Sequence, residues 1–483
     1  MKNQVFNPYL PSWEYVPDGE PRVFGDRLYV YGSHDLFNGE NFCLGDYVCW
    51  SAPVADLSDW RYEGVIYRQS QHPGFKKTTS MNAPDVVQGK DGRYYLYYQI
   101  NGEMSCAVAV CDTPAGKYAY LGHVRHPDGT AYGTQKNDPF CFDPGVLVDD
   151  DGEVYLYVGF YLQNKLLRKL MQRSHGIEAK GCYCLKLESD MLTVKGTHIP
   201  VLAGRDDAVG TPFEGHSFYE ASSPRKIDGK YYLIYSSELS HELCYAVSDY
   251  PDRDFRYGGI LVSIGDVGYR GRKSPNNYTG NTHGGMVEIN GQWYIFYHRQ
   301  TNKQKCARQG CAEKVTILPN GFIPQVEITS CGLNPAALKG EGSYEARIAC
   351  NLSGAQGTFA YLKTHEKDKK KLHPYFTQTG TDREENGDQY IANMKDGAYA
   401  GFKYFAFDGL RSISVSVRGE GSGSMEVRTK LGGKIICVIP VQQTAQWMEF
   451  TASVSSEVHG EQALYFTYSG TGYLDFNLFV LDR

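Results

Sequence analysis

The stretch IDGKYYLIY, residues 227–235, combines a tight turn with a strand rich in tyrosine and branched side chains. Asp-Gly favours tight turns because both residues tolerate positive φ, and tyrosine and isoleucine suit a pleated strand. Similar strands begin at residues 26, 92, 152 and 291, so five copies follow one another at intervals of 60 to 77 residues. Such self-similarity predicts an array of like units. The five strands span residues 26–31, 92–98, 152–157, 229–235 and 291–297.

Each repeated strand is preceded by a polar residue, seven to nine positions before the strand begins. Equivalent positions in a radial repeat meet near one axis, and carboxylates gathered there with a histidine are the ingredients of an active site. An aspartate beside glycine or proline is also common in turns, so the shared register, and no single residue, indicates function. For Asp85 we expect a structural role. The five residues are Asp18, Asp85, Asp143, Glu220 and His283.

The composition is that of a globular chain with a large core. Its 483 residues are 41% hydrophobic and 22% charged, enough for two or three domains. The net charge of −6 argues against a nucleic-acid surface, which needs a clustered basic excess. No run approaches the roughly 18 apolar residues of a membrane span. The 13 cysteines contain no CxxC pair, which favours free thiols in a reducing compartment. The N-terminal residues lack an apolar leader, so we expect a cytoplasmic protein, of undetermined oligomeric state.

The strand pattern predicts an all-β fold with two domains. Five units close as a five-bladed β-propeller of four-stranded blades, which we assign to residues 1–335. Few stretches are amphipathic; a short helix is expected near residues 162–172. The repeat ends near residue 333, and alternating runs of five to eight residues follow, broken by glycine and polar turns. Residues 340–483 are therefore predicted to form a β-sandwich of jelly-roll type.

The carboxylates suit the hydrolysis of a glycosidic bond. One carboxylic acid must protonate the leaving oxygen, while a second carboxylate activates water or attacks the sugar. The acid must keep its proton near neutral pH, which burial or a neighbouring negative charge arranges. Three carboxylates in one pocket can therefore act as base, acid and tuner of the acid. His283 is open to three interpretations: an ion ligand in the channel, a substrate contact or a packed core histidine.

The motifs around these residues resemble glycoside hydrolase family 43, and the resemblance spans all five repeats. PDGEP (17–21) before GDRLY (25–29) is similar to the family's PDPS…GDxYY opening, FDP (142–144) before DDDG (149–152) to its IDPS…DDDG motif, and YEA (219–221) to its TEGP…NGYYY segment. The family's members are five-bladed propellers that invert configuration. The resemblance implies that Asp18 is the general base, Asp143 the carboxylate that tunes the acid, and Glu220 the general acid. PDGEP departs from PDPS and brings an extra carboxylate, Glu20.

The resemblance also implies substrate contacts and an ion. THG (282–284) is similar to the fifth-blade segment whose histidine lies in the channel and in some members binds calcium, so His283 is a candidate substrate contact and calcium ligand. Arg308 stands where many members have a substrate-contacting arginine. Trp13 is a candidate pocket aromatic, although it can equally belong to the core. No cofactor is expected to be required, and the calcium would be structural.

The C-terminal part resembles a carbohydrate-binding module of family 6. The similar stretches are DGAY (396–399), AQWMEF (445–450) and LDF (474–476). In that family an aromatic pair clamps a sugar ring, which implies Tyr399 and Trp447 here. Tyr473 replaces an asparagine that usually helps to hold the sugar. The alternative is a sandwich that packs on the propeller and covers one side of its active-site mouth.

Together these features predict an inverting exo-glycosidase that removes terminal pentoses from plant hemicellulose oligosaccharides, as an α-L-arabinofuranosidase, a β-xylosidase or both. A β-galactofuranosidase on the same fold and a non-catalytic propeller lectin remain alternatives, and sister propeller families retain configuration through an aspartate nucleophile. An oligosaccharide is the expected partner, with neither nucleic acid nor membrane.

Overall fold

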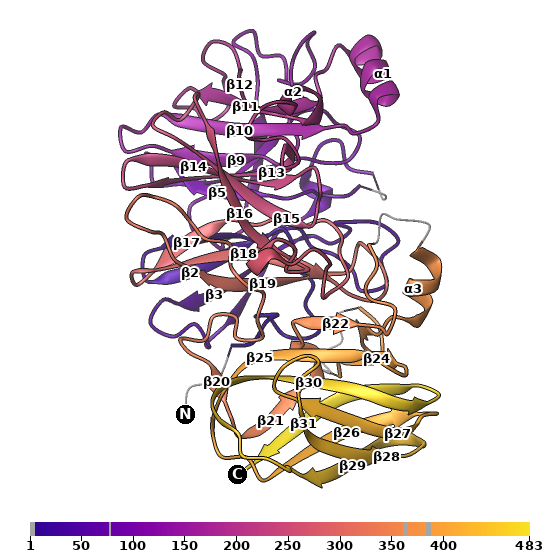
Figure 1. Cartoon of the computed structure of the whole chain (residues 1–483). Coiled ribbons are helices and arrows are strands. Elements are labelled where there is room, and N and C mark those ends of the chain that lie inside the picture. The colour runs from indigo at the N-terminus through magenta and orange to yellow at the C-terminus, as the bar shows by residue number, and fades with distance from the viewer. Residues whose placement is uncertain (1–4, 77–78, 361–365, 383–387) are drawn as a thin grey trace.

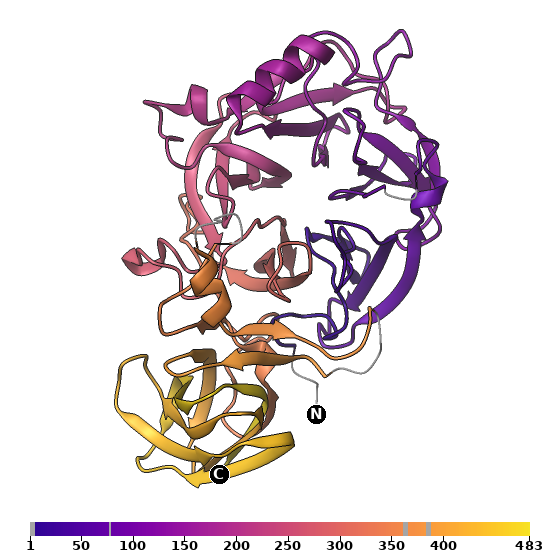
Figure 2. The same cartoon turned by 90° about the vertical axis from the view of Figure 1, so that its right-hand side faces the viewer.

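The structure is a computed structural model that describes residues 5–76, 79–360, 366–382 and 388–483. A ring of five sheets is followed by a sandwich of two sheets, which lies below the ring in Figure 1. Figure 2 shows the five sheets arranged around a common centre. The predicted all-β fold, a five-bladed β-propeller followed by a β-sandwich, is confirmed.

The first four blades are four-stranded antiparallel sheets whose strands pair in chain order, and the fifth has three strands. Blade by blade, the strands are β1 (Glu20–Phe24), β2 (Arg27–Tyr31), β3 (Tyr47–Pro53) and β4 (Arg61–Tyr67); β5 (Asp85–Gln88), β6 (Tyr94–Tyr98), β7 (Ala107–Cys111) and β8 (Ala119–His123); β9 (Gly145–Val148), β10 (Val154–Tyr161), β11 (Lys180–Leu187) and β12 (Ile199–Ala203); β13 (Phe218–Ile227), β14 (Lys230–Ser237), β15 (Glu242–Ser248) and β16 (Arg256–Ser263); and β17 (Met286–Ile289), β18 (Gln292–Gln300) and β19 (Arg308–Val315).

The repeated stretches form the second strand of each blade: β2, β6, β10, β14 and β18. The turn that leads into each one contains a glycine with positive φ, for example Gly229 at 76° and Gly291 at 80°, as expected of a tight turn. The polar residues seven to nine positions earlier therefore lie at the beginning of the first strands. First strands of neighbouring blades contact one another, β1 with β17 and β5, and β9 with β5 and β13, which brings these residues to the centre of the ring.

The N-terminal segment closes the ring against the fifth blade. The side chain of Asn7 exchanges two hydrogen bonds with the backbone of Ala312 in β19, at 2.9 and 2.8 Å. The backbone N–H of Tyr9 donates to the carbonyl of Gly310, 3.3 Å away. Residues from opposite ends of the propeller sequence thus lie side by side, and the segment occupies the edge that a fourth strand covers in the other blades.

The sandwich consists of two mostly antiparallel sheets around a core of aromatic and branched side chains. One sheet contains β20 (Leu338–Lys339), β22 (Asn351–Ser353), β25 (Tyr399–Asp408), β27 (Ser422–Arg428), β28 (Ile435–Val441) and β30 (His459–Thr471). The other contains β21 (Gly342–Glu345), β23 (Tyr375–Thr377), β24 (Tyr390–Met394), β26 (Ser412–Gly419), β29 (Thr444–Ser453) and β31 (Leu474–Asp482).

Helices are short and peripheral. The helix expected near residues 162–172 is α1, which begins three residues later and ends at His175. The Asn164 side chain caps its N-terminus by accepting from two backbone N–H groups, and Gly176 ends it at φ 74°. None of the helices in the described parts of the chain has the length and apolarity of a membrane span. The helices are α1 (Lys165–His175), α2 (Arg205–Ala208) and α3 (Lys367–Leu372), with 3-10 turns η1 (Gln69–Gln71), η2 (Tyr269–Gly271) and η3 (Ala346–Ile348).

The sandwich packs tightly on the propeller. The ring of Tyr278 stacks on Phe359 with centroids 5.7 Å apart. The buried ammonium of Lys403, on β25, lies 3.2 Å from Asp266 and 2.8 Å from Glu327. Paired charges and stacked rings of this kind are typical of a fixed interface, so the sandwich stands in a defined position beside the ring.

Candidate active site

A pocket of about 260 Å³ lies at the centre of the ring, and all three predicted catalytic carboxylates line it. Asp18 comes from the first blade, Asp143 from the third and Glu220 from the fourth. His283 and Arg308, from the fifth blade, also line the pocket. The structure thus brings together five residues that are far apart in the sequence. The other lining residues are Phe42, Cys43, Asn82, Ala83, Phe142, Phe160, Tyr219, Ser240, Gly280, Asn281 and Lys305.

Unusual backbone geometry directs the carboxylates into this pocket. Asp18 and Asp143 have φ of 56° and 44°, and Ala221, directly after Glu220, has φ of 72°. Non-glycine residues rarely adopt positive φ, and they do so most often at functional sites. Glu220 also lies between two register shifts in the pairing of β13 with β14. A bulge of this kind redirects a side chain out of the regular alternation of a strand.

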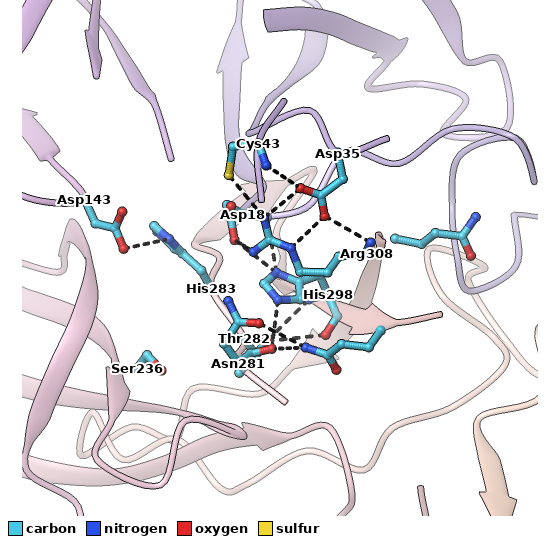
Figure 3. Close-up of polar contacts among 12 residues, drawn as sticks. Asp18, Asp35, Cys43, Asp143, Ser236, Asn281, Thr282, His283, His298 and Arg308 are labelled. Atoms are coloured by element: carbon cyan, nitrogen blue, oxygen red, sulfur yellow. Dashed lines mark hydrogen bonds and ion pairs between the residues drawn. The ribbon is translucent and has the colours of Figure 1, made fainter. Parts of the chain in front are cut away.

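Asp18 contacts two neighbours from the fifth blade, Arg308 and His298 (Figure 3). Arg308 Nη1 donates to Asp18 Oδ1 at 2.8 Å. His298 Nε2 bonds the carbonyl of Asn281 at 2.8 Å, so Nδ1 is free to accept the backbone N–H of Asp18 at 3.3 Å. Burial alone would raise the pKa of Asp18, but the positive charge of Arg308 outweighs it and holds that pKa well below its usual range.

Arg308 is itself fixed by a second carboxylate. Its Nε and Nη2 donate to the two oxygens of Asp35 at 2.8 and 3.0 Å, and Nη2 also lies 3.4 Å from Cys43 Sγ. Bidentate pairing of this kind fixes the plane of a guanidinium. Arg308, predicted as a substrate contact, therefore lies in the pocket wall and orients Asp18.

The surroundings of Glu220 and Asp143 raise the pKa of both carboxyl groups, in contrast to that of Asp18. Burial, with the negative charges of Asp143 and Asp18, raises the pKa of Glu220 to about 8. Burial also raises the pKa of Asp143 to about 7, against the opposing charge of His283. The negative charge of Asp143 disfavours ionisation of Glu220, so the two carboxyl groups do not both ionise readily near neutral pH.

His283 lies between two carboxylates. Its Nδ1 is 3.6 Å from Asp143 Oδ2, and its Nε2 is 3.7 Å from Glu20 Oε1 (Figure 3 shows the first contact). Burial would lower the pKa of His283, but Glu20, Asp143 and Asp18 raise it to about 9. The imidazolium form therefore prevails at neutral pH and places a positive charge beside Asp143.

The surroundings of His283 do not suit the calcium ion that the resemblance implies. Calcium takes six to eight oxygen ligands, whereas the groups that face His283 Nε2 include one carboxylate oxygen, Glu20 Oε1, which has no hydrogen-bond partner among the described residues. The other Glu20 oxygen accepts from Arg225 Nη2 at 2.8 Å and from Ser223 at 3.0 Å. Glu20 and His283 alone therefore offer fewer oxygen ligands than the six to eight that calcium takes.

Asp85 lies outside the pocket. It is fully buried and paired with Arg22 at 3.1 and 2.5 Å, and it accepts the backbone N–H of Val146 at 2.8 Å. These contacts join the first, second and third blades. The residue that shares the register of the catalytic carboxylates therefore has a structural environment.

Aromatic side chains line the pocket, but Trp13 does not contribute to it. Trp13 packs against Trp50 at 5.9 Å within the apolar cluster of the first blade, so the expectation that it contacts substrate needs correction. Phe142, Phe160 and Tyr219 form a chain of rings with centroids 5.2 Å apart. Phe142 and Tyr219 directly precede Asp143 and Glu220, a sequence signal that was available and was missed.

In the sandwich, Tyr399 and Trp447 are on different sheets. Tyr399 begins β25 and packs edge-on against Tyr465 at 6.4 Å, whereas Trp447 is on β29 and contacts Tyr390 at 5.3 Å. The guanidinium of Arg418 lies 4.2 Å from the centre of the Trp447 ring. Tyr399 and Trp447 thus lie on different sheets and pack against different aromatic side chains, and their pairing around a sugar stays a prediction.

Comparison with protein-family models matches both domains. Residues 21–323 match the model described as glycosyl hydrolases family 43, and residues 374–483 match carbohydrate binding module (family 6). The first match includes Asp143 and Glu220. Asp18 lies three residues before it.

Known relatives match either the whole chain or part of it. A xylosidase/arabinosidase of Thermoclostridium stercorarium is 49% identical over 486 residues, covering 100% of this chain and 99% of that protein. A β-xylosidase of Xylanibacter ruminicola is 30% identical over 313 residues, covering 60% of this chain and 89% of that protein.

Solved structures share the fold. A β-xylosidase/α-arabinofuranosidase from a compost metagenome, solved with xylotriose, has a TM-score of 0.52 at 25% identity and covers 66% of this chain and 96% of its own. An arabinoxylan arabinofuranohydrolase of Bacillus subtilis has a TM-score of 0.51 at 20% identity and covers 98% of this chain and 96% of its own. The latter likeness concerns the fold of both domains together.

Proposed function

The chain belongs to family 43 of the glycosyl hydrolases, and from that premise we propose that it removes terminal pentoses from hemicellulose oligosaccharides, as a β-xylosidase, an α-L-arabinofuranosidase or both. The observation that carries the proposal is the opposite tuning of two carboxyl groups in one pocket. The pKa of Asp18 lies well below its usual range, while that of Glu220 is raised to about 8. At neutral pH the pocket therefore holds one ionised base and one protonated acid, the pair that glycoside hydrolysis requires.

In the proposed reaction Glu220 gives its proton to the glycosidic oxygen as the bond to the anomeric carbon breaks. Asp18 takes a proton from a water molecule, whose oxygen forms the new bond to that carbon from the opposite face of the ring. The products are a free pentose of inverted configuration and a shortened oligosaccharide. Another proton exchange with solvent returns Asp18 and Glu220 to their starting forms.

Asp143 and His283 set the conditions for this step. The charge of Asp143 raises the proton affinity of Glu220, and the His283 imidazolium, 3.6 Å from Asp143, keeps that charge in place. The guanidinium of Arg308, 2.8 Å from Asp18, likewise keeps Asp18 ionised. All acid, base and charge-balancing groups come from side chains, so we propose that catalysis needs no cofactor.

The size and lining of the pocket support action at chain ends. Its volume of about 260 Å³ is below the roughly 300–1,000 Å³ typical of sites for drug-sized ligands. The rings of Phe142, Phe160 and Tyr219 offer apolar surface to the faces of a sugar. A pocket of this size suits one or two sugar rings, and the relatives named xylosidase/arabinosidase and β-xylosidase point to pentoses.

We propose that the sandwich mainly supports the pocket. It contacts the loops after β2 and β18: Asn302 N–H donates to the Phe376 carbonyl at 2.8 Å, and Lys303 lies 3.9 Å from the centre of the Tyr375 ring. The loop after β18 also carries Lys305 of the pocket.

The 13 cysteines are all free thiols, which supports a reducing compartment such as the cytoplasm as the site of action.

The test is a panel of p-nitrophenyl β-xyloside, α-arabinofuranoside and β-galactofuranoside, together with xylobiose, assayed with the wild type, with Glu220→Ala and with Glu457→Ala as an exposed control. We expect release from the two pentosides by the wild type and the control, and in Glu220→Ala a loss of at least about 100-fold on xylobiose with a smaller loss on the p-nitrophenyl pentosides. Equal, negligible rates throughout would identify a lectin, and preference for the galactofuranoside would replace the substrate assignment.

The stereochemistry is tested separately. Proton NMR of the first-formed sugar distinguishes an inverted from a retained anomer before mutarotation. A retained anomer would make Asp18 a nucleophile and would refute the role of base proposed for it.

A further inference from the structure

The second blade contains a cluster of two histidines and a glutamate that the proposed reaction does not use. His72 lies directly after η1, Glu103 in the loop between β6 and β7, and His123 at the end of β8. One ligand atom from each of the three residues lies within 4.8 Å of the other two. We call this group the His72–Glu103–His123 cluster.

The arrangement of nitrogen and oxygen atoms matches a divalent ion of the zinc class. His72 Nε2 is 3.1 Å from Glu103 Oε1, and His123 Nε2 is 2.9 Å from Glu103 Oε2. A tetrahedral ion bound at about 2.0–2.1 Å holds its ligand atoms roughly 3.3 Å apart. The three ligand atoms lie within 4.8 Å of one another, so they would have to draw together by up to about 1.5 Å to surround an ion with two imidazoles and one carboxylate as ligands.

The other nitrogen of each imidazole is already engaged. His72 Nδ1 is 2.8 Å from the hydroxyl of Tyr98, which in turn contacts the hydroxyl of Tyr67 at 2.7 Å. His123 Nδ1 is 2.8 Å from the hydroxyl of Tyr120. Outer partners of this kind fix the orientation and tautomer of metal-binding histidines. A hydroxyl can either donate or accept, so both rings can present an unprotonated Nε2 without losing their outer hydrogen bond.

The cluster is closed on one side and open on the other. A methyl group at Gly74 would come within 2.6 Å of Glu103 Oε1 and 3.3 Å of His72 Nε2, so the backbone there covers the site closely. Glu103 and His123 also line a cavity of about 580 Å³, whose wall includes Ser174 and His175 of α1. An ion could enter from this side and keep a water molecule as its fourth ligand.

A second group of similar composition, His216, Glu242 and Cys244, is less suitable. Glu242 is 1% exposed, and its Oε1 already receives contacts from His216 at 2.6 Å, Ser237 at 2.6 Å and Cys244 at 3.5 Å. One oxygen thus satisfies the whole group, which leaves no accessible position for an ion.

We propose that the His72–Glu103–His123 cluster binds one divalent ion of the zinc class and thereby fixes the loop between β6 and β7. The loop is connected to the active site by two side chains. Gln99 Nε2 donates to the carbonyl of Glu103 at 2.5 Å, and Asn82, which lines the catalytic pocket, donates to Gln99 Oε1 at 2.5 Å. The ion stabilises the face of the second blade that borders the pocket, and it takes no part in the chemical step.

The experiment measures zinc binding to the full chain. Protein stripped with chelator is titrated with Zn²⁺ by calorimetry, its metal content is measured after gel filtration, and Tm is recorded with and without Zn²⁺. The variants are His123→Asn and Glu103→Gln, with His216→Asn for the other cluster and His459→Asn as an exposed control. Glu220→Gln tests binding at the catalytic carboxylates. Far-UV circular dichroism verifies that each variant folds, and pentosidase activity gives a second check for every variant except Glu220→Gln.

We expect one zinc per chain in the wild type, in His216→Asn, in His459→Asn and in Glu220→Gln, with Tm raised by at least about 2 °C at saturating zinc. His123→Asn and Glu103→Gln should bind at least about 10-fold more weakly and lose the Tm shift. The proposal is overturned if the wild type binds no zinc below about 100 μM, if the two cluster variants bind like the wild type, or if His216→Asn or Glu220→Gln removes the ion instead.

Discussion

Arg308 Nη1 lies 2.8 Å from Asp18 Oδ1, while the remaining edge of the same guanidinium is bound to Asp35. One buried cation therefore serves two carboxylates with different tasks. Asp35 fixes the plane of the guanidinium, and the guanidinium keeps Asp18 ionised in a pocket whose burial would otherwise favour the protonated form. The Arg308–Asp18 ion pair thus keeps Asp18 ionised, as a base must be, although other carboxyl groups surround it.

Replacement of Arg308 by lysine should weaken the ion pair with Asp18 while keeping a positive charge. Lysine cannot bind Asp35 in a bidentate manner, so the charge moves away from Asp18. Since the wild-type pKa of Asp18 is held below its usual range, the variant pKa rises, and activity is lost at a higher pH on the acid side. We expect kcat/KM at pH 7 to fall about 10- to 100-fold.

The measurement is the pH profile of kcat/KM on p-nitrophenyl β-xyloside, with Arg61→Lys as a control at an exposed ion pair. An acid limb that stays at the wild-type position in Arg308→Lys would contradict the role of Arg308.

Glu220 should determine the alkaline limb of the pH profile of kcat/KM on xylobiose, whose leaving group needs protonation. Its pKa is raised to about 8, and the acid must be protonated to act, so wild-type activity should decline as the pH rises through about 8. In Glu220→Gln this limb should disappear, and turnover of xylobiose should fall about 100- to 10,000-fold. Substrates with a good leaving group should be affected less, because they need little protonation. Equal losses on xylobiose and on the p-nitrophenyl substrate would show that Glu220 is not the acid.

Asp143→Asn should move the alkaline limb in the acid direction. The negative charge of Asp143 contributes to the raised pKa of Glu220, so its removal lowers that pKa, and Glu220 loses its proton at a lower pH. We expect a shift of about one pH unit or more, since a unit corresponds to ~1.4 kcal/mol of interaction between the two groups. Glu457→Gln, which removes an exposed charge, should leave the limb in place. A limb that moves equally in both variants would point to net charge as the cause.

The residues that could be predicted from sequence are those that the repeat places in register. Asp18, Asp143 and Glu220 stand at similar distances before repeated strands, eight or nine positions, so geometry alone gathers them at the axis. Asp85 shares that register but faces Arg22, which shows that register identifies a position and not a role. The role depends on neighbours.

Those neighbours come from remote parts of the chain. Asp35 and Arg308 are 273 residues apart, and Asp18 and His298 are 280 apart, so no local pattern links them. Trp13 failed as a pocket residue because an aromatic side chain in a strand-rich region is equally suited to a core. The pairing of Tyr399 with Trp447 around a sugar stays a prediction, because sequence spacing does not tell which of two sheets a strand joins.

The contact between the two domains offers a last test, at Tyr15. Its hydroxyl donates to Gln378 Oε1 of the sandwich at 2.6 Å, and both residues are buried. Tyr15→Phe leaves a buried carbonyl oxygen without this partner, which costs about 1–2 kcal/mol, so Tm should fall. Because Tyr15 does not line the catalytic pocket, the limbs of the pH profile should keep their positions. Tyr250→Phe, at a side chain that is 45% exposed, is the matched control and should leave Tm nearly unchanged. If Tyr15→Phe unfolds at the wild-type temperature, the interface does not depend on this hydrogen bond; if it shifts a limb, the sandwich acts on the catalytic groups themselves.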